Sequence, residues 1–498
     1  MKKLLFTFFL LLNAIACRLF AQDGKLDSTF SNDGIVTTDL GGHDVASGVA
    51  VRPDGRVVVA GYSSVNNWTY FALAQYKIDG TLDSTFGSDG IVLTTFSEPS
   101  YGGSIALQPD GKIVVGGGSY IFWLLARYNE DGSLDSTFGI NGEVTTETLD
   151  YDVAIMSLII EEDGKILAIG YSGETQPMSN VYYSIAVARY NSDGTLEDGI
   201  AYYGSSEIDR GYSACRQSDG KIVISSVSEG ALELLRVDSN LYVDNTFANN
   251  GFETTQFVTS AIPQVAIQSD ARIILVSANN SELLINRFTA GGLPDTSFGD
   301  GGNVTTPVTS NAFLATSVAI VEGDKIQVAG TSDESIVVAR YKADGNLDSS
   351  FGTNGITITD FASEINEVGT AMAIAPGGKI VVAASTNSDF LVARYNSSLE
   401  FVNVGDIDNT FRNNSAFIYP NPIEENATLK YSLKNEAEIS IQLLDVEGRV
   451  LKTFVANERQ LAGDHEQKII FPEGLASGSY LIVISSPNGS KLTVKVAK

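Results

Sequence analysis

The chain has 498 residues, of which 43% are hydrophobic and 18% are charged, and its formal net charge is −28. This length is too great for one ordinary domain, and the composition is typical of a folded protein. The negative charge argues against nucleic acid and anionic membranes as partners, because both require a basic protein surface.

Residues 1–21 have the pattern of an export signal: two lysines, a short apolar stretch at 4–16, and a small residue at the end. The alternative is a lipoprotein signal acylated at Cys17. No later stretch has the apolar length of a transmembrane helix, so we do not expect an integral membrane protein. After cleavage Cys215 is the only cysteine, which excludes an intrachain disulfide.

One sequence unit recurs along residues 22–404. Its clearest copy, LDSTFGSDGIV at residues 82–92, is followed by a run of the type DGKIVV and then by one of the type LARY. The basic residue of the DGK-like turn recurs every 51 to 56 residues, at positions 56, 112, 165, 221, 272, 325 and 379. Each unit holds four short β-rich runs separated by turn signals. Seven units of four strands predict an all-β fold, a seven-bladed β-propeller with four-stranded blades.

The repeat region begins and ends inside a unit. Residues 26–38 supply a fourth strand without the first three, and residues 392–395 supply a third strand without a fourth. Residues 36–38 should therefore complete the last blade, since ring closure removes open sheet edges.

The motifs LDSTFG, PDGKIVV and LARYN-DG resemble those of the delta-60 repeat family of β-propeller proteins, over residues 23–400. This resemblance implies an architecture and says almost nothing about activity. The copy at residues 195–199 differs most, because it lacks the phenylalanine of LDSTFG.

Residues 405–416 read as a polar linker, and the alternating runs of residues 417–498 predict a small Ig-like β-sandwich of about seven strands. YPNP, LLDVEGRV, LASGSYLIVI and the basic last strand resemble the type A sorting domain of the type IX secretion system. The motif residues are Tyr419, Pro420, Asn421, Pro422, Gly448, Gly478 and Tyr480. The resemblance implies a Gram-negative bacterium, the type IX machinery as a partner, and an extracellular or cell-surface location. A purely structural appendage is the alternative.

Two side chains recur once in most units. A phenylalanine occupies one slot at positions 30, 86, 138, 247, 298 and 351, and we expect it to be buried between strands. An arginine recurs in the third strand at positions 127, 189, 236, 287, 340 and 394, with Gln75 in the remaining copy. We expect these arginines to form structural ion pairs with the aspartate of the LDST turn.

Residues suited to catalysis are scarce. The two histidines, His43 and His465, cannot supply a multi-histidine metal site. Cys215 aligns with alanines of other units, which indicates a packed side chain rather than a nucleophile. The turn at residues 129–135 resembles a calcium loop only faintly and is better explained as turn chemistry. We therefore expect no catalytic residue, no metal site and no cofactor, with calcium as the alternative.

We expect a non-enzymatic binding or adhesion module for an extracellular glycan or protein. The alternative is an extracellular glycan-active enzyme that uses carboxylates, because Asp and Glu total 60 and no pair stands out.

The turns after the first and third strands of each unit repeat, whereas the loops after the second and fourth strands vary; 62–70 and 171–183 are two of these expected loops. Aromatic side chains with polar neighbours suit contacts with a glycan or a protein. We therefore predict a ligand site on the variable face, formed by Trp68, Tyr101, Tyr151, Tyr182 and Asp209.

Overall fold

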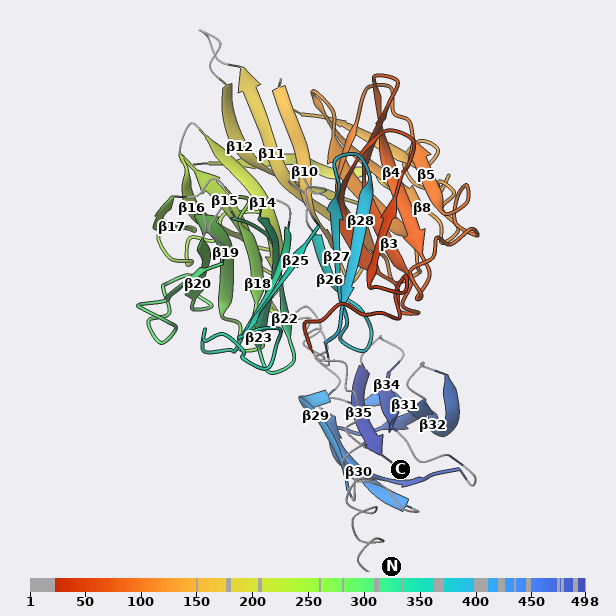
Figure 1. The fold of residues 1–498 in the computed structure, drawn as a ribbon. Coiled ribbons are helices and arrows are strands. Elements are labelled where there is room, and N and C mark those ends of the chain that lie inside the picture. The colour runs from red at the N-terminus through yellow and green to blue at the C-terminus, as the bar shows by residue number, and fades with distance from the viewer. Residues whose placement is uncertain are drawn as a thin grey trace, which may run out of the picture. The chain divides into compact units, whose positions relative to one another are not determined.

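The computed structural model describes residues 23–497 except for 149–150, 176–180, 205–207, 259–260, 280–281, 309–312, 333–334, 362–370, 398–410, 420–425, 434–435, 445–448, 473–474, 476–478 and 487–490. Every regular element in the described residues is a β-strand, as the sequence predicted (Figure 1). The chain divides into two compact units, residues 1–402 and 403–498. The expected export signal lies outside the described residues.

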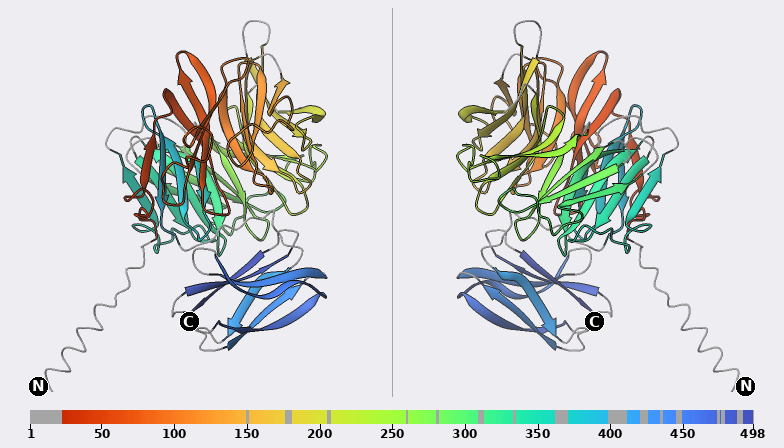
Figure 2. Two further views of the ribbon diagram at one scale, coloured as in Figure 1. Left: turned by 90° about the vertical axis from the view of Figure 1, so that its right-hand side faces the viewer. Right: turned by 90° about the vertical axis from the view of Figure 1, so that its left-hand side faces the viewer.

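The described part of the first unit holds seven four-stranded antiparallel sheets (Figures 1 and 2). The first three are β2 (His43–Val51), β3 (Val57–Val65), β4 (Trp68–Tyr76) and β5 (Ile91–Thr94); β6 (Tyr101–Leu107), β7 (Ile113–Gly118), β8 (Phe122–Tyr128) and β9 (Glu143–Glu147); and β10 (Tyr151–Ile160), β11 (Ile166–Thr175), β12 (Val181–Tyr190) and β13 (Leu196–Tyr203). The next two are β14 (Asp209–Arg216), β15 (Ile222–Ser228), β16 (Ala231–Val237) and β17 (Phe252–Val258); and β18 (Gln264–Ile267), β19 (Ile273–Asn279), β20 (Glu282–Phe288) and β21 (Asn303–Pro307). The last two are β22 (Phe313–Val321), β23 (Lys325–Ser332), β24 (Ser335–Tyr341) and β25 (Ile356–Asp360); and β26 (Ala371–Ile374), β27 (Ile380–Ser385), β28 (Phe390–Tyr395) and β1 (Ile35–Thr38).

The first strands of successive sheets form a closed ring. The strands β2, β6, β10, β14, β18, β22 and β26 contact one another in this order, and β26 also contacts β2. This arrangement is that of a β-propeller, in which each sheet is a blade and its first strand is innermost.

The last blade is completed by the N-terminal strand, as predicted. β1 pairs antiparallel with β28, with Val36 opposite Val392 and Thr38 opposite Phe390. Gly24 N donates to the carbonyl oxygen of Asn396 at 2.7 Å, which extends the closure beyond the strands. Closure therefore uses the same backbone pairing as any other blade.

The variable loops are shorter than the sequence indicated. Residues 62–70, expected to be a loop, belong almost entirely to the β3–β4 hairpin. Its two-residue turn, Asn66–Asn67, has φ of 53° and 62°. Asparagine tolerates this left-handed region, and two such residues suffice for a tight hairpin turn.

A buried cluster joins each blade to the next, and the β18–β21 blade shows it clearly. Arg287 Nε donates to Asp295 Oδ2 at 2.8 Å, and the guanidinium carbon lies 4.5 Å from the centre of the Phe298 ring. Arg287 Nη1 donates to the carbonyl oxygen of Ala343, in the β24–β25 turn of the next blade, at 2.6 Å. Phe298 packs against Gly345 of that same turn. One arginine therefore binds a carboxylate, an aromatic ring and the neighbouring blade.

The cluster repeats around the ring. The Arg Nε to Asp Oδ2 distance is 2.7–3.0 Å in the pairs Arg127–Asp135, Arg236–Asp244, Arg340–Asp348 and Arg394–Asp27. All six repeated phenylalanines are fully buried, as predicted. The predicted pairing of arginine with the LDST aspartate is confirmed for every repeated arginine except Arg189, which pairs with Glu161. Burial acts to raise the pKa of Asp27, but hydrogen bonds from Lys379 and Thr29 and the charge of Arg394 lower it to about 2. These carboxylates stay charged because each has several donors.

The blade β2–β5 is also bridged to the next blade by a guanidinium, but different residues supply the contacts. Gln75 stands where the other blades have arginine, and its Nε2 donates to Asp83 Oδ2 at 2.9 Å. Arg52, at the end of the innermost strand, donates from Nε to Gln75 Oε1 at 2.8 Å. Its Nη2 donates to the carbonyl oxygen of Glu130 in the next blade at 3.1 Å. In this blade the bridging guanidinium therefore comes from Arg52, directly after β2, and not from the third strand.

The second unit contains two antiparallel sheets in its described residues. Their strands, in spatial order, are β29 (Phe411–Tyr419), β30 (Asn426–Leu433) and β33 (Gly463–Ile470); and β32 (Val450–Gln460), β31 (Ala437–Leu444), β34 (Ser479–Ser485) and β35 (Lys491–Ala497). Leu429, Ile441 and Ile482 are fully buried in one apolar cluster that joins the sheets. Two sheets around a shared core form a sandwich; that it is Ig-like stays a prediction. β29 begins inside the stretch predicted as a linker.

Replacing Phe86 by Ala should lower the free energy of unfolding by about 3–5 kcal/mol, because the ring is fully buried between two blades and would leave a cavity. Thermal unfolding measures this. Ile140→Ala is the control, since Ile140 is 81% exposed and should leave the melting temperature almost unchanged. Equal melting temperatures for the two variants would contradict a structural role for the repeated phenylalanine.

Candidate functional site

The blade β10–β13 breaks the repeated cluster. Glu197 stands in place of the LDST aspartate, Asp198 and Gly199 follow it, and no phenylalanine is present. β13 begins at Leu196, so an extended strand replaces the LDSTFG turn. Arg189 pairs instead with Glu161, from Nε to Oε2 at 2.7 Å and from Nη2 to Oε1 at 3.3 Å.

The neighbouring blade changes at the matching position. Where five other blade junctions place a glycine against the phenylalanine of the preceding blade, this junction has Leu241; the glycines are Gly80, Gly132, Gly194, Gly292 and Gly345. Leu241 has φ of 65°, a conformation that is costly for a branched side chain. It is partly buried beside Tyr203, whose hydroxyl donates to the carbonyl oxygen of Leu241. The phenylalanine of this blade and the glycine that would face it in the next blade are therefore both absent, although the two positions lie about 40 residues apart in the sequence.

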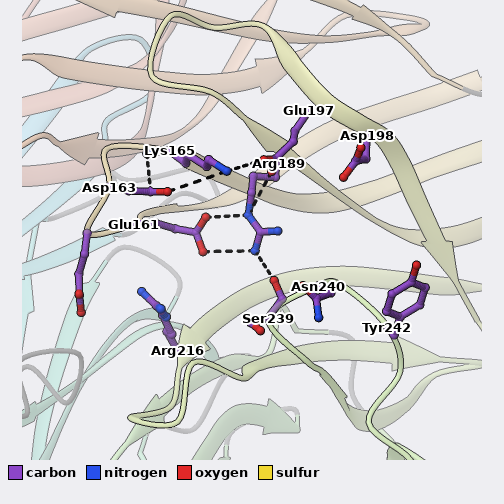
Figure 3. Close-up of a pocket in the computed structure, with 11 residues that line it drawn as sticks. Glu161, Asp163, Lys165, Arg189, Glu197, Asp198, Arg216, Ser239, Asn240 and Tyr242 are labelled. Carbon is purple, nitrogen blue, oxygen red and sulfur yellow. Dashed lines mark hydrogen bonds and ion pairs between the residues drawn. The ribbon is translucent and has the colours of Figure 1, made fainter.

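A polar pocket of about 670 Å³ lies at this junction (Figure 3). Its lining residues come from the ends of β12 and β14, from the start of β13, and from the β10–β11 and β16–β17 turns. They are Glu161, Glu162, Asp163, Lys165, Arg189, Glu197, Asp198, Arg216, Ser239, Asn240 and Tyr242. The size is ordinary for a small-molecule site, although the lining is unusually polar.

Five of the eight charged lining residues form ion pairs with one another, because Asp163 also pairs with Lys165. Five acidic and three basic residues line it, which gives a formal charge of −2. Lys165 pairs with Glu197, and Arg189 pairs with Glu161 (Figure 3). Arg189 Nη2 also donates to the carbonyl oxygen of Ser239 at 2.9 Å, so the bond between blades survives here. Among the described residues, the lining groups without an ion pair are Glu162, Asp198 and Arg216.

Comparison with known protein families identifies both parts of the chain. Residues 52–86, 108–138, 161–199, 324–351 and 376–411 match the family described as "Domain of unknown function (DUF5122) beta-propeller". Residues 417–498 match the "Secretion system C-terminal sorting domain". The chain carries DUF5122 propeller repeats and a type IX secretion sorting domain. Both expected resemblances are confirmed, and the sorting domain places the protein outside the cell or on its surface.

Solved structures resemble the DUF5122 propeller only distantly. A fungal alcohol oxidase of the AA5 family, in complex with copper, is 12% identical with a TM-score of 0.42, covering 93% of this chain and 98% of that chain. The polysaccharide lyase Uly1 is 11% identical with a TM-score of 0.43, covering 76% and 97%. Drosophila Plexin A in complex with Semaphorin 1b is 9% identical with a TM-score of 0.38, covering 75% and 88%. A search of curated proteins found no match.

Most residues of the sorting-domain motif lie outside the described residues. Tyr480 is buried in the core of the second unit, at 8% exposure. Tyr419 is the last residue of β29, and its side chain is outside the described part of the chain. The motif residues that are wholly outside it are Pro420, Asn421, Pro422, Gly448 and Gly478. Within the described residues, no helix has the length and apolar character needed to cross a membrane.

The residues predicted to form a ligand site lie at the opposite ends of the propeller strands from the pocket. Tyr101 is 50% exposed and packs edge-on against Tyr62 with the ring centres 5.1 Å apart. Trp68 and Tyr182 are half-buried, and the side chain of Tyr151 is outside the described residues. Asp209 is fully buried, so its carboxylate does not face solvent.

None of these five residues lines the pocket, and they remain predictions for the variable face. The sequence signal for the pocket is the degenerate copy at residues 195–199, for which no function was predicted.

The variable face of the DUF5122 propeller also holds an arginine between aromatic rings. The guanidinium carbon of Arg210 lies 3.7 Å from the centre of the Tyr183 ring and 5.0 Å from that of Tyr171. Tyr183 Oη donates to Asp152 Oδ2 at 2.9 Å, and Arg210 Nη2 lies 3.5 Å from the same oxygen. The protein's own arginine thus occupies the space between these rings.

Three carboxylates of the variable face could together hold a cation. Asp39, Asp44 and Asp389 place oxygen atoms within 4.8 Å of one another. Asp44 is buried and already accepts bonds from Leu40 N and Ser63 Oγ. In the turn suspected of calcium binding, by contrast, Asp131 accepts bonds from its own turn, which fits the turn interpretation.

The propeller also holds titratable groups with raised pKa values away from the pocket. Cys215 packs beside an apolar cluster, and burial raises the pKa of its thiol. Burial also raises the pKa of Glu233 to about 7. The nearby charge of Asp209 raises this pKa further, whereas hydrogen bonds from Thr254 and Ser226 lower it.

The contact between glycine and phenylalanine at an intact junction can be tested by two alanine substitutions. Gly345 and Gly377 have φ of 92° and 84°, so Ala costs about 1–2 kcal/mol in backbone conformation at either position. A Cβ at 345 would also lie 2.8 Å from the Phe298 ring, whereas one at 377 meets nothing within 4 Å. Gly345→Ala should therefore lower the melting temperature clearly more than Gly377→Ala. Equal losses would show that the glycine is required for its backbone conformation alone.

Proposed function

We propose that this protein is a non-enzymatic binding module, which type IX secretion delivers outside the cell to recognise a glycan or a protein ligand. The observation that carries the proposal is the polar pocket between the blades β10–β13 and β14–β17. Six blade junctions carry the buried phenylalanine of the repeat, whereas the seventh lacks it and has, besides an apolar cluster, a pocket lined by hydrogen-bonding groups. A local departure from a repeated packing scheme, in a protein that otherwise keeps it, indicates a functional site.

The chemistry of the pocket supports binding over catalysis. A carboxylate-dependent glycosidase needs a general acid with a raised pKa beside the site and a second carboxylate across from it. Glu161 and Glu197, the two acids closest to that role in the pocket, are each held in ion pairs with Arg189 and Lys165. Both carboxylates are therefore already bound by the protein's own cations rather than left free to contact a substrate.

The described carboxylates with a raised pKa lie outside the pocket lining, and burial is the main cause in each of them: Asp44, Glu143, Glu233 and Glu253. The pKa of Glu233 is about 7, but its side chain is only 1% exposed and is not part of the pocket lining. A substrate outside the protein cannot reach it, so this residue does not favour the alternative of a glycan-active enzyme.

Binding and turnover can be separated with the exported full-length protein. We expect glycan-array and pull-down screens to find a ligand that is retained reversibly, and mass spectrometry to recover that ligand intact after prolonged incubation. Cleaved or otherwise altered ligand would establish the enzyme alternative. Failure of both screens to retain any ligand would contradict a binding function.

A further inference from the structure

The polar pocket at this junction has the features of a recognition site for a sugar. The first is an exposed aromatic ring at its rim. Tyr242 is 72% exposed and occupies a turn position that is filled in other blades by smaller or aliphatic residues, namely Thr81, Ser133, Thr195, Leu293 and Asn346. A tyrosine ring presents a flat apolar face with a polar end, which suits the C–H face and the hydroxyls of a pyranose ring.

The second feature is a set of hydrogen-bonding groups that the protein leaves available. Glu162 and Asp198 are exposed and can accept bonds from hydroxyl groups, and Arg216 can donate to hydroxyl and ring oxygens. Asn240, on the β16–β17 turn beside Tyr242, both donates and accepts (Figure 3). Hydrogen bonds between a hydroxyl and a charged group are stronger than neutral ones, so a few of them can orient a ligand.

The third feature is the charge balance. Lys165 and Arg189 are already paired with Glu197 and Glu161, so neither cation is free to bind an anionic ligand. The remaining Glu162, Asp198 and Arg216 sum to −1, inside a chain of net charge −28. Uronic acids and phosphates would be repelled, whereas the unpaired Arg216 disfavours a polycationic peptide.

We propose that this pocket binds a neutral oligosaccharide, with Tyr242 stacking on a pyranose ring and with Asp198, Glu162 and Arg216 bonding to its hydroxyls. The proposal rests on the binding function above and adds the ligand class and the residues. The pocket volume of about 670 Å³ has room for two or three sugar rings.

The test measures binding of defined trisaccharides to the full-length protein by calorimetry. The neutral probes are cellotriose, maltotriose and mannotriose, and the charged probes are trigalacturonic acid and trilysine. We expect at least one neutral probe to bind and both charged probes to bind at least tenfold more weakly. Binding of trigalacturonic acid or trilysine in preference to every neutral probe would overturn the assignment of ligand class.

Variants locate the site. Tyr242→Ala should weaken binding of the neutral probe at least tenfold, as should Asn240→Trp, which fills the pocket from an exposed position. The matched control is Leu293→Ala: Leu293 has the same turn position in the next blade and is 59% exposed, so its removal should leave affinity unchanged. All three sites are exposed, so the fold should survive each substitution.

Substitutions on the variable face separate this inference from the broader function. If Trp68→Ala or Tyr101→Ala abolishes saccharide binding while Tyr242→Ala does not, the protein binds glycans at the other face and the pocket assignment is wrong. If no neutral trisaccharide binds but the screens above retain a different ligand, the saccharide inference fails and the binding function stands.

Discussion

The propeller depends on a guanidinium that bridges each pair of neighbouring blades, and at every junction except that of Arg189 this guanidinium is buried. Burying a charged group is costly unless every donor finds an acceptor, and here the arginine meets a carboxylate, an aromatic ring and a carbonyl oxygen of the next blade. Removing one partner of such a pair typically costs about 3–5 kcal/mol, because the other charge is left buried alone. This interaction explains why LARY and LDSTFG recur together: each supplies half of a contact that neither can make by itself.

The same dependence explains where the protein departs from its repeat. In the blade β2–β5 the guanidinium moves from the third strand to Arg52, and Gln75 completes the connection, so the junction stays closed. In the blade β10–β13 the phenylalanine is absent and Leu241 replaces the facing glycine, yet Arg189 still reaches Ser239 of the next blade. The hydrogen bond between the blades is kept, Leu241 and Tyr203 pack against the apolar cluster of the junction, and the polar pocket lies at the same junction.

The sequence was sufficient for the architecture because periodicity and turn chemistry are local signals. It predicted the four-stranded units, the pairing of residues 36–38 with the last blade, the burial of the phenylalanines and the pairing of arginine with aspartate. It did not predict the pocket, because the lining residues come from two blades and from positions as far apart in the sequence as Glu161 and Tyr242, which only the fold brings together. It also treated Asp209 as a surface residue, since nothing local distinguishes a strand end that turns inward from one that faces solvent.

The most direct test of the bridging guanidinium exchanges the two residues that differ in the blade β2–β5. Arg52→Gln should lower the melting temperature strongly, because the carbonyl oxygen of Glu130 loses the hydrogen bond that it accepts from the preceding blade. The double variant Arg52→Gln with Gln75→Arg recreates the arrangement of the β6–β9 blade, where Arg127 lies beside Gln108. The account predicts that thermal unfolding of the double variant returns close to that of the unaltered protein. A double variant as unstable as Arg52→Gln alone would contradict it.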